Sequence, residues 1–172
     1  MFGIGNKEPD AIELLKDDHQ AVTELFEEYE SCKDESKSGE KVKIARQICR
    51  ALTVHATIEE EIFYPAARRA VSEADDQLDE AAVEHQSLKD IIARLEAAPP
   101  SDPLYDAGVK VLSEYVKHHV KEEEGELFPK VRSSEIDLAA LGETMSARKA
   151  ELDQSSHAAP ARGDGQRSRA SK

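Results

Sequence analysis

Apolar side chains recur along the chain at intervals of three and four residues, the spacing that places them on one face of an α-helix. Four long segments show this pattern, at about residues 10–33, 44–71, 74–97 and 104–131. In the last of them, the positions predicted to face inward are Leu112, Tyr115, Val116 and Leu127. The pattern predicts an all-α fold, an up-down-up-down four-helix bundle.

Helix-breaking residues divide these segments. A stretch rich in Ser, Lys and Gly, from Asp34 to Gly39, separates the first two, and Pro99 and Pro100 end the third. Pro65 lies inside the second segment, where its missing N–H predicts a kink or local break before the helix resumes toward residue 71.

The C-terminal part of the chain differs from the four long segments. Residues 136–152 form a shorter amphipathic pattern, which predicts a fifth helix packed across one end of the bundle. Residues 153–172 have the composition of a disordered tail. We therefore expect one domain, at residues 1–152, followed by a tail at 153–172, as suits a chain of 172 residues.

Composition and charge narrow the functions to consider. The net charge of −13 argues against a nucleic-acid partner, because phosphate binding requires a basic patch. The N-terminus does not resemble a leader, and no stretch reaches the roughly 20 apolar residues of a membrane span. A cytoplasmic location is expected, with Cys32 and Cys49 reduced and structural.

An internal repeat relates the two halves of the chain. The sequence that starts at His55, HATIEEEIFYP, aligns with HHVKEEEGELFP when the second histidine of the latter, His119, is matched to His55. The two histidines are 64 residues apart. His19 and His85 are 66 residues apart, and each precedes one of the two HxxxE motifs by about 35 residues. The chain is thus predicted to be a duplicated helical hairpin.

The repeated residues carry the chemistry. Positions i and i+4 share a helix face, so each HxxxE motif places an imidazole and a carboxylate in the same space. Burying two carboxylates without partners costs several kcal/mol each, and a dication offsets that cost. The predicted metal ligands are His19, His55, Glu59, His85, His119 and Glu123.

The donor set also indicates which metal is bound. Six ligands suit two octahedral ions that share both carboxylates, and imidazole with carboxylate favours iron, with manganese as second choice. The expected cofactor is therefore a pair of iron ions joined by an oxo or hydroxo bridge. Glu60, Glu61, Glu122 and Glu126 are expected at the surface, whereas Glu124 has a position from which it could reach inward.

These motifs, with the FYP and LFP sequences that follow them, resemble the hemerythrin family and in particular its bacterial HHE cation-binding domains, over about residues 10–132. The resemblance implies a bundle with a non-haem di-iron site. Members that carry oxygen have a further histidine where this chain has Lys89, and a final HxxxxD motif where this chain has HxxxE. The missing imidazole predicts an additional open metal position, unless Lys89 caps it.

The leading functional prediction is a di-iron protein that binds or senses O₂ or NO, or handles peroxide. Alternatives are an enzyme for peroxide breakdown or iron–sulfur repair, as known among such relatives, and a regulatory module with an unidentified protein partner. Tyr29, Tyr64 and Tyr115 are candidates to assist a bound oxygen ligand, although packing in the core is the favoured explanation for them.

Overall fold

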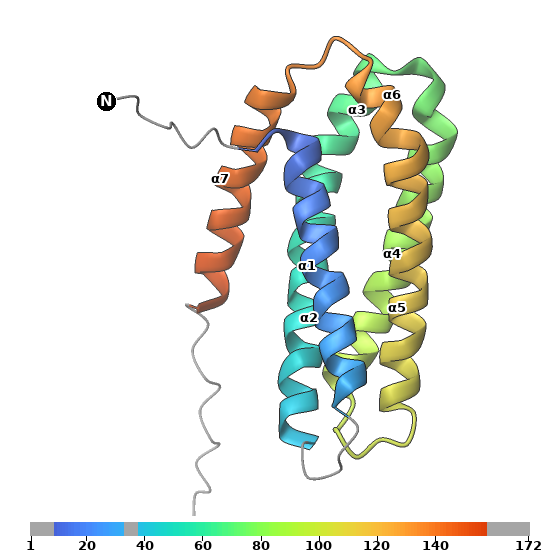
Figure 1. Ribbon diagram of the computed structural model, residues 1–172, viewed down its shortest axis with the longest axis vertical. Coiled ribbons are helices and arrows are strands. Elements are labelled where there is room, and N and C mark those ends of the chain that lie inside the picture. Colours follow the sequence, from blue (N-terminus) through green and yellow to red (C-terminus); the bar gives the residue numbers. More distant parts are fainter. Residues whose placement is uncertain (1–8, 33–37, 158–172) are drawn as a thin grey trace, which may run out of the picture.

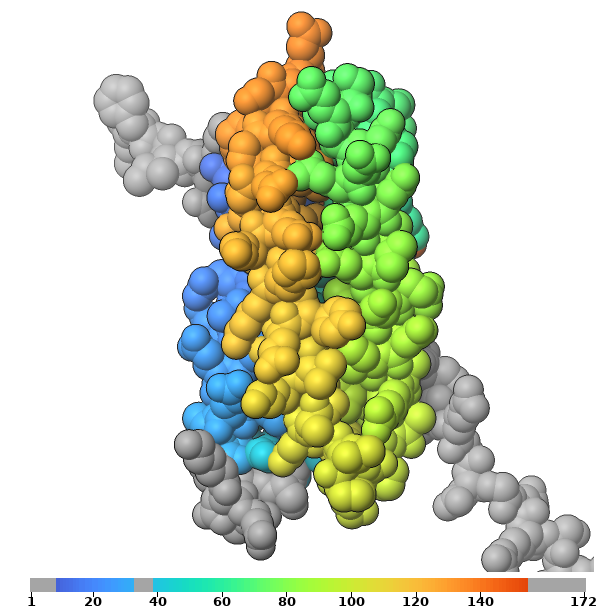
Figure 2. Space-filling model, turned by 90° about the vertical axis from the view of Figure 1, so that its right-hand side faces the viewer, coloured from blue at the N-terminus to red at the C-terminus, as the bar shows by residue number. Residues whose placement is uncertain are grey.

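The computed structural model describes residues 9–32 and 38–157, and within these ranges it contains helices and no strand. Four long helices run antiparallel to their neighbours and form the bundle (Figure 1). They are α1 (Ala11–Ser31), α2 (Ser38–Ile58), α4 (Asp75–Ala97) and α5 (Tyr105–Glu122). The all-α, four-helix-bundle prediction is confirmed. Figure 2 shows the side chains of α4 and α5 meeting along most of their length on one face.

Shorter elements extend two of the long helices. A π-helical turn at Glu59–Phe63 joins α2 to α3 (Tyr64–Ala70), and a second at Glu123–Leu127 joins α5 to α6 (Phe128–Arg132). In each turn a backbone N–H reaches back five residues, from Tyr64 to Glu59 and from Phe128 to Glu123. The distortion expected at Pro65 is this wide turn before the proline, and the helix does not break there.

A capping box fixes the start of α1. The Asp10 carboxylate accepts hydrogen bonds from the backbone N–H groups of Ile12 and Glu13, each at 3.0 Å, and the Glu13 carboxylate accepts one from the Asp10 N–H. Arg132, at the end of α6, donates to Asp10 at 3.1 Å. This hydrogen bond therefore links the start of α1 to the end of α6 at the same end of the bundle.

The apolar core has two parts, with the buried histidines between them. One part contains, among others, Val22, Leu52, Leu88, Leu112 and Val116, and the other contains Leu15, Ile58, Phe63, Leu78 and Phe128. Each fully buried side chain of this kind contributes about 1.5–3 kcal/mol to folding. Polar groups held between two such clusters are fixed in position and shielded from water.

Two details of the packing differ from expectation. The fifth helix, α7 (Leu138–His157), lies alongside α1 and α2 and not across one end of the bundle (Figure 1). Tyr115 is 45% exposed, because the inward stripe of α5 passes through Leu112, Val116 and His119. Helical spacing allows the residue either three or four positions after Leu112 to face the core, which is Tyr115 or Val116. In the structure it is Val116.

The C-terminal boundary also lies further along the chain than expected. α7 continues to His157, so the predicted start of the tail at residue 153 falls inside this helix. The rest of the predicted tail, 158–172, lies outside the described residues, as does part of the predicted break at 34–39. Cys32 and Cys49 are free and buried, in agreement with a structural role. None of the described helices combines the length and apolar character that crossing a membrane requires.

The contact between α7 and α1 depends on Gly142. A Cβ atom at this position would lie 2.6 Å from the carbonyl oxygen of Pro9 and 2.8 Å from the backbone nitrogen of Ala11. We predict that Gly142→Ala lowers the free energy of unfolding by about 1–3 kcal/mol, since backbone must move to relieve the overlap. Urea unfolding measures this, with Gly39→Ala as control because nothing lies within 4 Å of its added Cβ. An unchanged stability in Gly142→Ala would contradict the packing.

Candidate metal centre

The four predicted histidine ligands come from four different helices and meet in the middle of the bundle. His19 lies on α1, His55 on α2, His85 on α4 and His119 on α5, and all are buried. Both predicted carboxylate ligands open a π-helical turn, and Glu59 is 0% and Glu123 3% exposed. The structure therefore brings together all six side chains that the sequence pattern selected.

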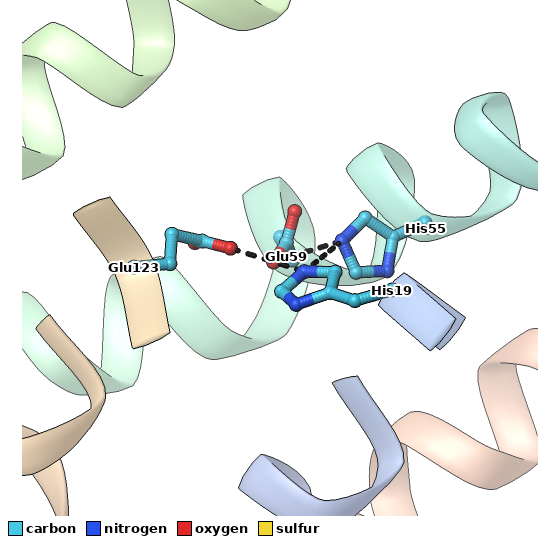
Figure 3. Close-up of side chains that lie close together, drawn as sticks. All are labelled: His19, His55, Glu59 and Glu123. Carbon is cyan, nitrogen blue, oxygen red and sulfur yellow. Dashed lines mark hydrogen bonds and ion pairs between the residues drawn. The ribbon is translucent and has the colours of Figure 1, made fainter. Parts of the chain in front are cut away.

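The six side chains form a closed ring of donor atoms. The Nε2 atoms of His19 and His55 are 3.1 Å apart, as are those of His85 and His119. Each carboxylate connects the two histidine pairs. Glu59 lies 3.3 Å from Nε2 of His55 and 3.4 Å from Nε2 of His85. Glu123 lies 3.3 Å from Nε2 of His19 and 3.5 Å from Nε2 of His119. Figure 3 shows His19, His55, Glu59 and Glu123 pointing toward one another.

Tyr64 makes the two halves of this ring unequal. Its hydroxyl donates a hydrogen bond to Oε1 of Glu123 at 2.8 Å and lies 3.3 Å from His85 Nε2. Glu123 therefore faces both histidine pairs through Oε2 alone, whereas Glu59 uses one oxygen for each pair. Phe128, the residue 64 positions after Tyr64, instead stacks on His19 with ring centroids 5.8 Å apart. Only one half of the centre thus has a phenol oxygen beside it.

A second set of carboxylates contacts the outer nitrogens of the histidines. Nδ1 of His19 lies 2.8 Å from Glu124, and Nδ1 of His85 lies 2.9 Å from Glu60. Nδ1 of His119 lies 2.7 Å from Glu84, and Nδ1 of His55 lies 3.5 Å from Asp18. Ionised carboxylates only accept hydrogen bonds, so the first three contacts place a proton on Nδ1. The Nε2 atom of each neutral ring is then a lone-pair donor directed into the centre.

The centre has more lone pairs than hydrogens to satisfy them. Burial opposes ionisation of Glu59, but the charge of His55 and contacts with His85 hold its pKa well below its ordinary value. Burial would also lower the pKa of His55, yet Glu59 raises it to about 10. Both oxygens of Glu59 and Oε2 of Glu123 have no hydrogen-bond partner. A cation, or a proton on one histidine of each pair, is needed to balance this arrangement.

The spacing of the donors fits metal ions. Two ligands at about 2.1 Å from one ion and at right angles lie about 3.0 Å apart, close to the 3.1–3.5 Å observed around the ring. One cluster of potential ligand atoms contains His19, His55, Glu59 and Glu123, and another contains Glu59, His85 and His119. Two ions with Glu59 shared between them match these clusters.

The outer carboxylates are the part of the site that sequence reasoning missed. Asp18 and Glu84 were not singled out. Glu60 was expected at the surface, where its side chain is 35% exposed, but its contact with His85 was not expected. The repeat contains the signal, since Asp18 and Glu84 are 66 residues apart, like His19 and His85, and Glu60 and Glu124 are 64 apart. Glu124 reaches a histidine and not the ring of donors.

Lys89 does not cap the metal centre. Its ammonium group donates to both oxygens of Glu60, at 2.6 and 2.7 Å, and its side chain is 44% exposed. The same carboxylate accepts from Nδ1 of His85. The residue that replaces the additional histidine of oxygen carriers therefore supports a carboxylate that orients a metal-site histidine.

We predict that Glu84→Gln weakens metal binding without removing it. The neutral amide oxygen accepts the Nδ1–H of His119 more weakly than a carboxylate does, and loss of such a partner costs about 10- to 100-fold in affinity. Competition with a chelator of known affinity measures the change. Glu114→Gln, a carboxylate change elsewhere on α5, is the control. Equal affinity in the two variants would contradict this role of Glu84.

Comparisons with known proteins agree with this geometry. The family profile described as Hemerythrin HHE cation binding domain matches residues 10–131. A protein of Nostoc sp. (strain PCC 7120 / SAG 25.82 / UTEX 2576), named DNA nickase, is 34% identical over 122 residues, which are 71% of this chain and 33% of that protein. This chain therefore spans about a third of that relative's length.

A solved structure extends the comparison to three dimensions. The hemerythrin HHE cation-binding domain-containing protein of Mycobacterium kansasii superposes with a TM-score of 0.71 and 26% sequence identity, over 87% of this chain and 90% of that one. The matched fold, the matched profile and the ring of six donors lead to one conclusion. The chain belongs to the hemerythrin family of HHE cation-binding domains.

Proposed function

We propose that the chain is a non-haem di-iron protein that binds or senses O₂ or NO, or handles peroxide, through the ring of four histidines and two glutamates. The observation that carries this proposal is the set of buried carboxylate oxygens without hydrogen-bond partners, on Glu59 and Glu123, between two pairs of facing imidazoles. Two iron ions held there would supply reversible binding or reduction of a small oxygen or nitrogen ligand.

The donor set favours iron over other common cations. Calcium and magnesium prefer oxygen ligands, whereas four of the six donors are imidazole nitrogens. Structural zinc takes four ligands and closes its coordination, whereas this ring offers six donors shared by two positions. Manganese has the next best match in ligand type and geometry.

The protein supplies the orientation of the donors and an apolar cover on one side of the centre. Outer carboxylates hold three of the four imidazoles by hydrogen bonds of 2.7–2.9 Å. Ile58, Phe63 and Leu127 belong to one of the two apolar clusters that flank the centre, and each is at most 3% exposed. Such a rigid setting, with apolar side chains on one side, strengthens electrostatic interactions there and limits the contact of Glu59 and Glu123 with bulk water.

The name of the Nostoc relative does not extend to this chain. The match covers 33% of that protein, so most of it has no counterpart here. A chain with net charge −13 repels DNA phosphates, which basic side chains normally bind. Iron–sulfur repair and a regulatory role stay predictions, since nothing among the described residues favours either.

Ligand binding can be tested by spectroscopy of the iron-loaded protein. We expect the reduced, oxygen-free protein to change its ultraviolet-visible spectrum when O₂, NO or peroxide is added, and Glu59→Gln to show no such change. A reversible change without consumption of the ligand indicates a carrier or sensor, and rapid consumption of peroxide indicates an enzyme. An iron-loaded protein that responds to none of the three ligands would contradict the proposal.

One observation favours peroxide breakdown as the second candidate. The hydroxyl of Tyr64 lies 2.8 Å from Oε1 of Glu123 and 3.3 Å from Nε2 of His85, so it brings a proton donor to the edge of the centre. Tyr64→Phe reproduces the residue found at the equivalent position, Phe128. If the second candidate is correct, we expect this variant to retain its iron and consume peroxide about 10- to 100-fold more slowly. Unchanged turnover would remove Tyr64 from the reaction.

A further inference from the structure

A pocket of about 300 Å³ lies against the imidazoles of the metal centre. All four metal-site histidines line it, whereas Glu59, Glu123 and Tyr64 do not. The pocket therefore reaches the centre from the side opposite to the two carboxylates. A molecule held in it would approach the metal positions from the histidine side, away from Glu59 and Glu123.

The inner wall of this pocket is apolar and follows the internal repeat. Four of its buried members each lie three residues from a metal-site histidine: Val22, Leu52, Leu88 and Val116. Val22 and Leu88 are 66 residues apart, and Leu52 and Val116 are 64 apart, as are the histidines beside them. A charged ligand would lose its water of hydration against this wall without replacement, so an uncharged ligand is favoured.

The pocket breaks the repeat at its outer part. Ala21 and Ala51 line it, and the residues at the equivalent positions in the second half are Ser87 and Tyr115. Small side chains on α1 and α2 thus leave space that larger side chains would fill. The pocket accordingly opens toward α1, α2 and α7, while residues of α4 and α5 contribute to its inner wall.

Charged residues of α2 and α7 mark the mouth of the pocket. Arg50 donates to Asp153 at 2.9 Å, and Lys149 pairs with Asp18, and all four residues line the pocket. The side chains of Arg50 and Lys149 are 39% and 33% exposed, so this end meets solvent. The polar mouth and the apolar inner wall together suit a ligand that enters from water and buries an apolar body.

The volume exceeds the need of a diatomic ligand. An apolar cavity of about 150 Å³ holds benzene, so about twice that volume accommodates an organic molecule of roughly ten non-hydrogen atoms. We propose that the pocket binds a small uncharged organic hydroperoxide, or the corresponding alcohol, with its oxygen end toward the histidines and its apolar body against Val22, Leu52, Leu88 and Val116. This inference rests on the proposed function, because it names an organic ligand for the same centre.

Calorimetry with an unreactive probe tests the pocket. The probe is 2-phenyl-2-propanol, an uncharged aromatic alcohol of the proposed size, added to the iron-loaded full chain. We expect saturable binding of one molecule per chain, weakened about tenfold or more by Ala51→Leu, whose side chain occupies the pocket. Ala21→Leu provides a second variant if Ala51→Leu does not fold. Ala82→Leu, on the exposed face of α4, is the matched control and should bind like the parent protein.

The response to NO separates this inference from the proposed function. NO needs little space, so Ala51→Leu should keep the spectral response of the parent protein to NO while losing the alcohol. Absence of saturable alcohol binding, or equal binding in Ala51→Leu and Ala82→Leu, would overturn the pocket assignment. Alcohol binding with the expected loss in Ala51→Leu, but no response of iron to O₂, NO or peroxide, would support the pocket and contradict the proposed function.

Discussion

Glu59→Gln is expected to deprive the protein of both metal ions and not of one. Glu59 faces His55 with one oxygen and His85 with the other, so a single carboxylate serves both histidine pairs. Glutamine keeps the shape but removes the negative charge from a position with 0% exposure. Loss of one partner from a buried charge cluster costs about 3–5 kcal/mol, which corresponds to a decrease in affinity of roughly a hundredfold or more.

Elemental analysis of the purified variant measures this effect. Glu61→Gln is the matched control, because Glu61 lies two residues further along, is exposed and pairs with Arg148. The control should retain two ions per chain, and circular dichroism should show the same helix content in both variants. Retention of one tightly bound ion in Glu59→Gln would mean that this carboxylate serves a single metal, contrary to the ring geometry.

Removal of the metal is expected to lower the melting temperature by about 10 °C. A ligand that binds only the folded chain, present at about 1,000 times its dissociation constant, adds roughly 4 kcal/mol of stability. Each kcal/mol corresponds to about 2–4 °C for a domain of this size. Without metal, the buried carboxylates of Glu59 and Glu123 are destabilised. Three of their four oxygens have no hydrogen-bond partner.

Scanning calorimetry before and after dialysis against a chelator provides the measurement. Returning iron should restore the original melting temperature, which separates metal loss from irreversible damage. In Glu59→Gln, the chelator should have little effect, because that variant has already lost its ions. If the parent protein loses its metal, as shown by elemental analysis, and melts at the same temperature, the ions do not stabilise the bundle.

The inward positions of the six predicted metal ligands could be inferred from the sequence because their geometry is local. Helix periodicity alone brings His55 and Glu59 to one face, and the repeat does the same for His119 and Glu123. His19 and His85 lie within apolar stripes that had to face the core. No knowledge of how the helices rotate about one another was needed to predict that all six side chains point inward.

Contacts between helices were less accessible to sequence reasoning. The hydrogen bonds from His85 to Glu60 and from His19 to Glu124 depend on the π-helical turns, which shift the residues that follow Glu59 and Glu123 around their helices. Hydrophobic periodicity assumes a regular 3.6-residue turn. It correctly places Glu60 at the surface but does not predict the contact of Glu60 with His85. The same turn begins the short helix that presents Tyr64 to Glu123.

The position of α7 could not be predicted for a different reason. An amphipathic pattern indicates that a helix buries one face, but it does not say which surface of the bundle receives that face. The structure places α7 against α1 and α2, where Gly142 lies close to the backbone of Pro9 and Arg148 pairs with Glu61 at 2.7 Å. These contacts join residues that lie far apart in the sequence, so the pattern of apolar residues within α7 does not reveal them.

The metal content of the purified parent protein tests the central claim most directly. Elemental analysis against protein concentration should give about two irons per chain, as the two donor clusters joined by Glu59 require. Manganese at the same ratio would preserve the dinuclear site and change the identity of the ion. A chain that takes up no metal when iron is supplied, or that binds one zinc, would contradict the di-iron centre and leave only the helical bundle.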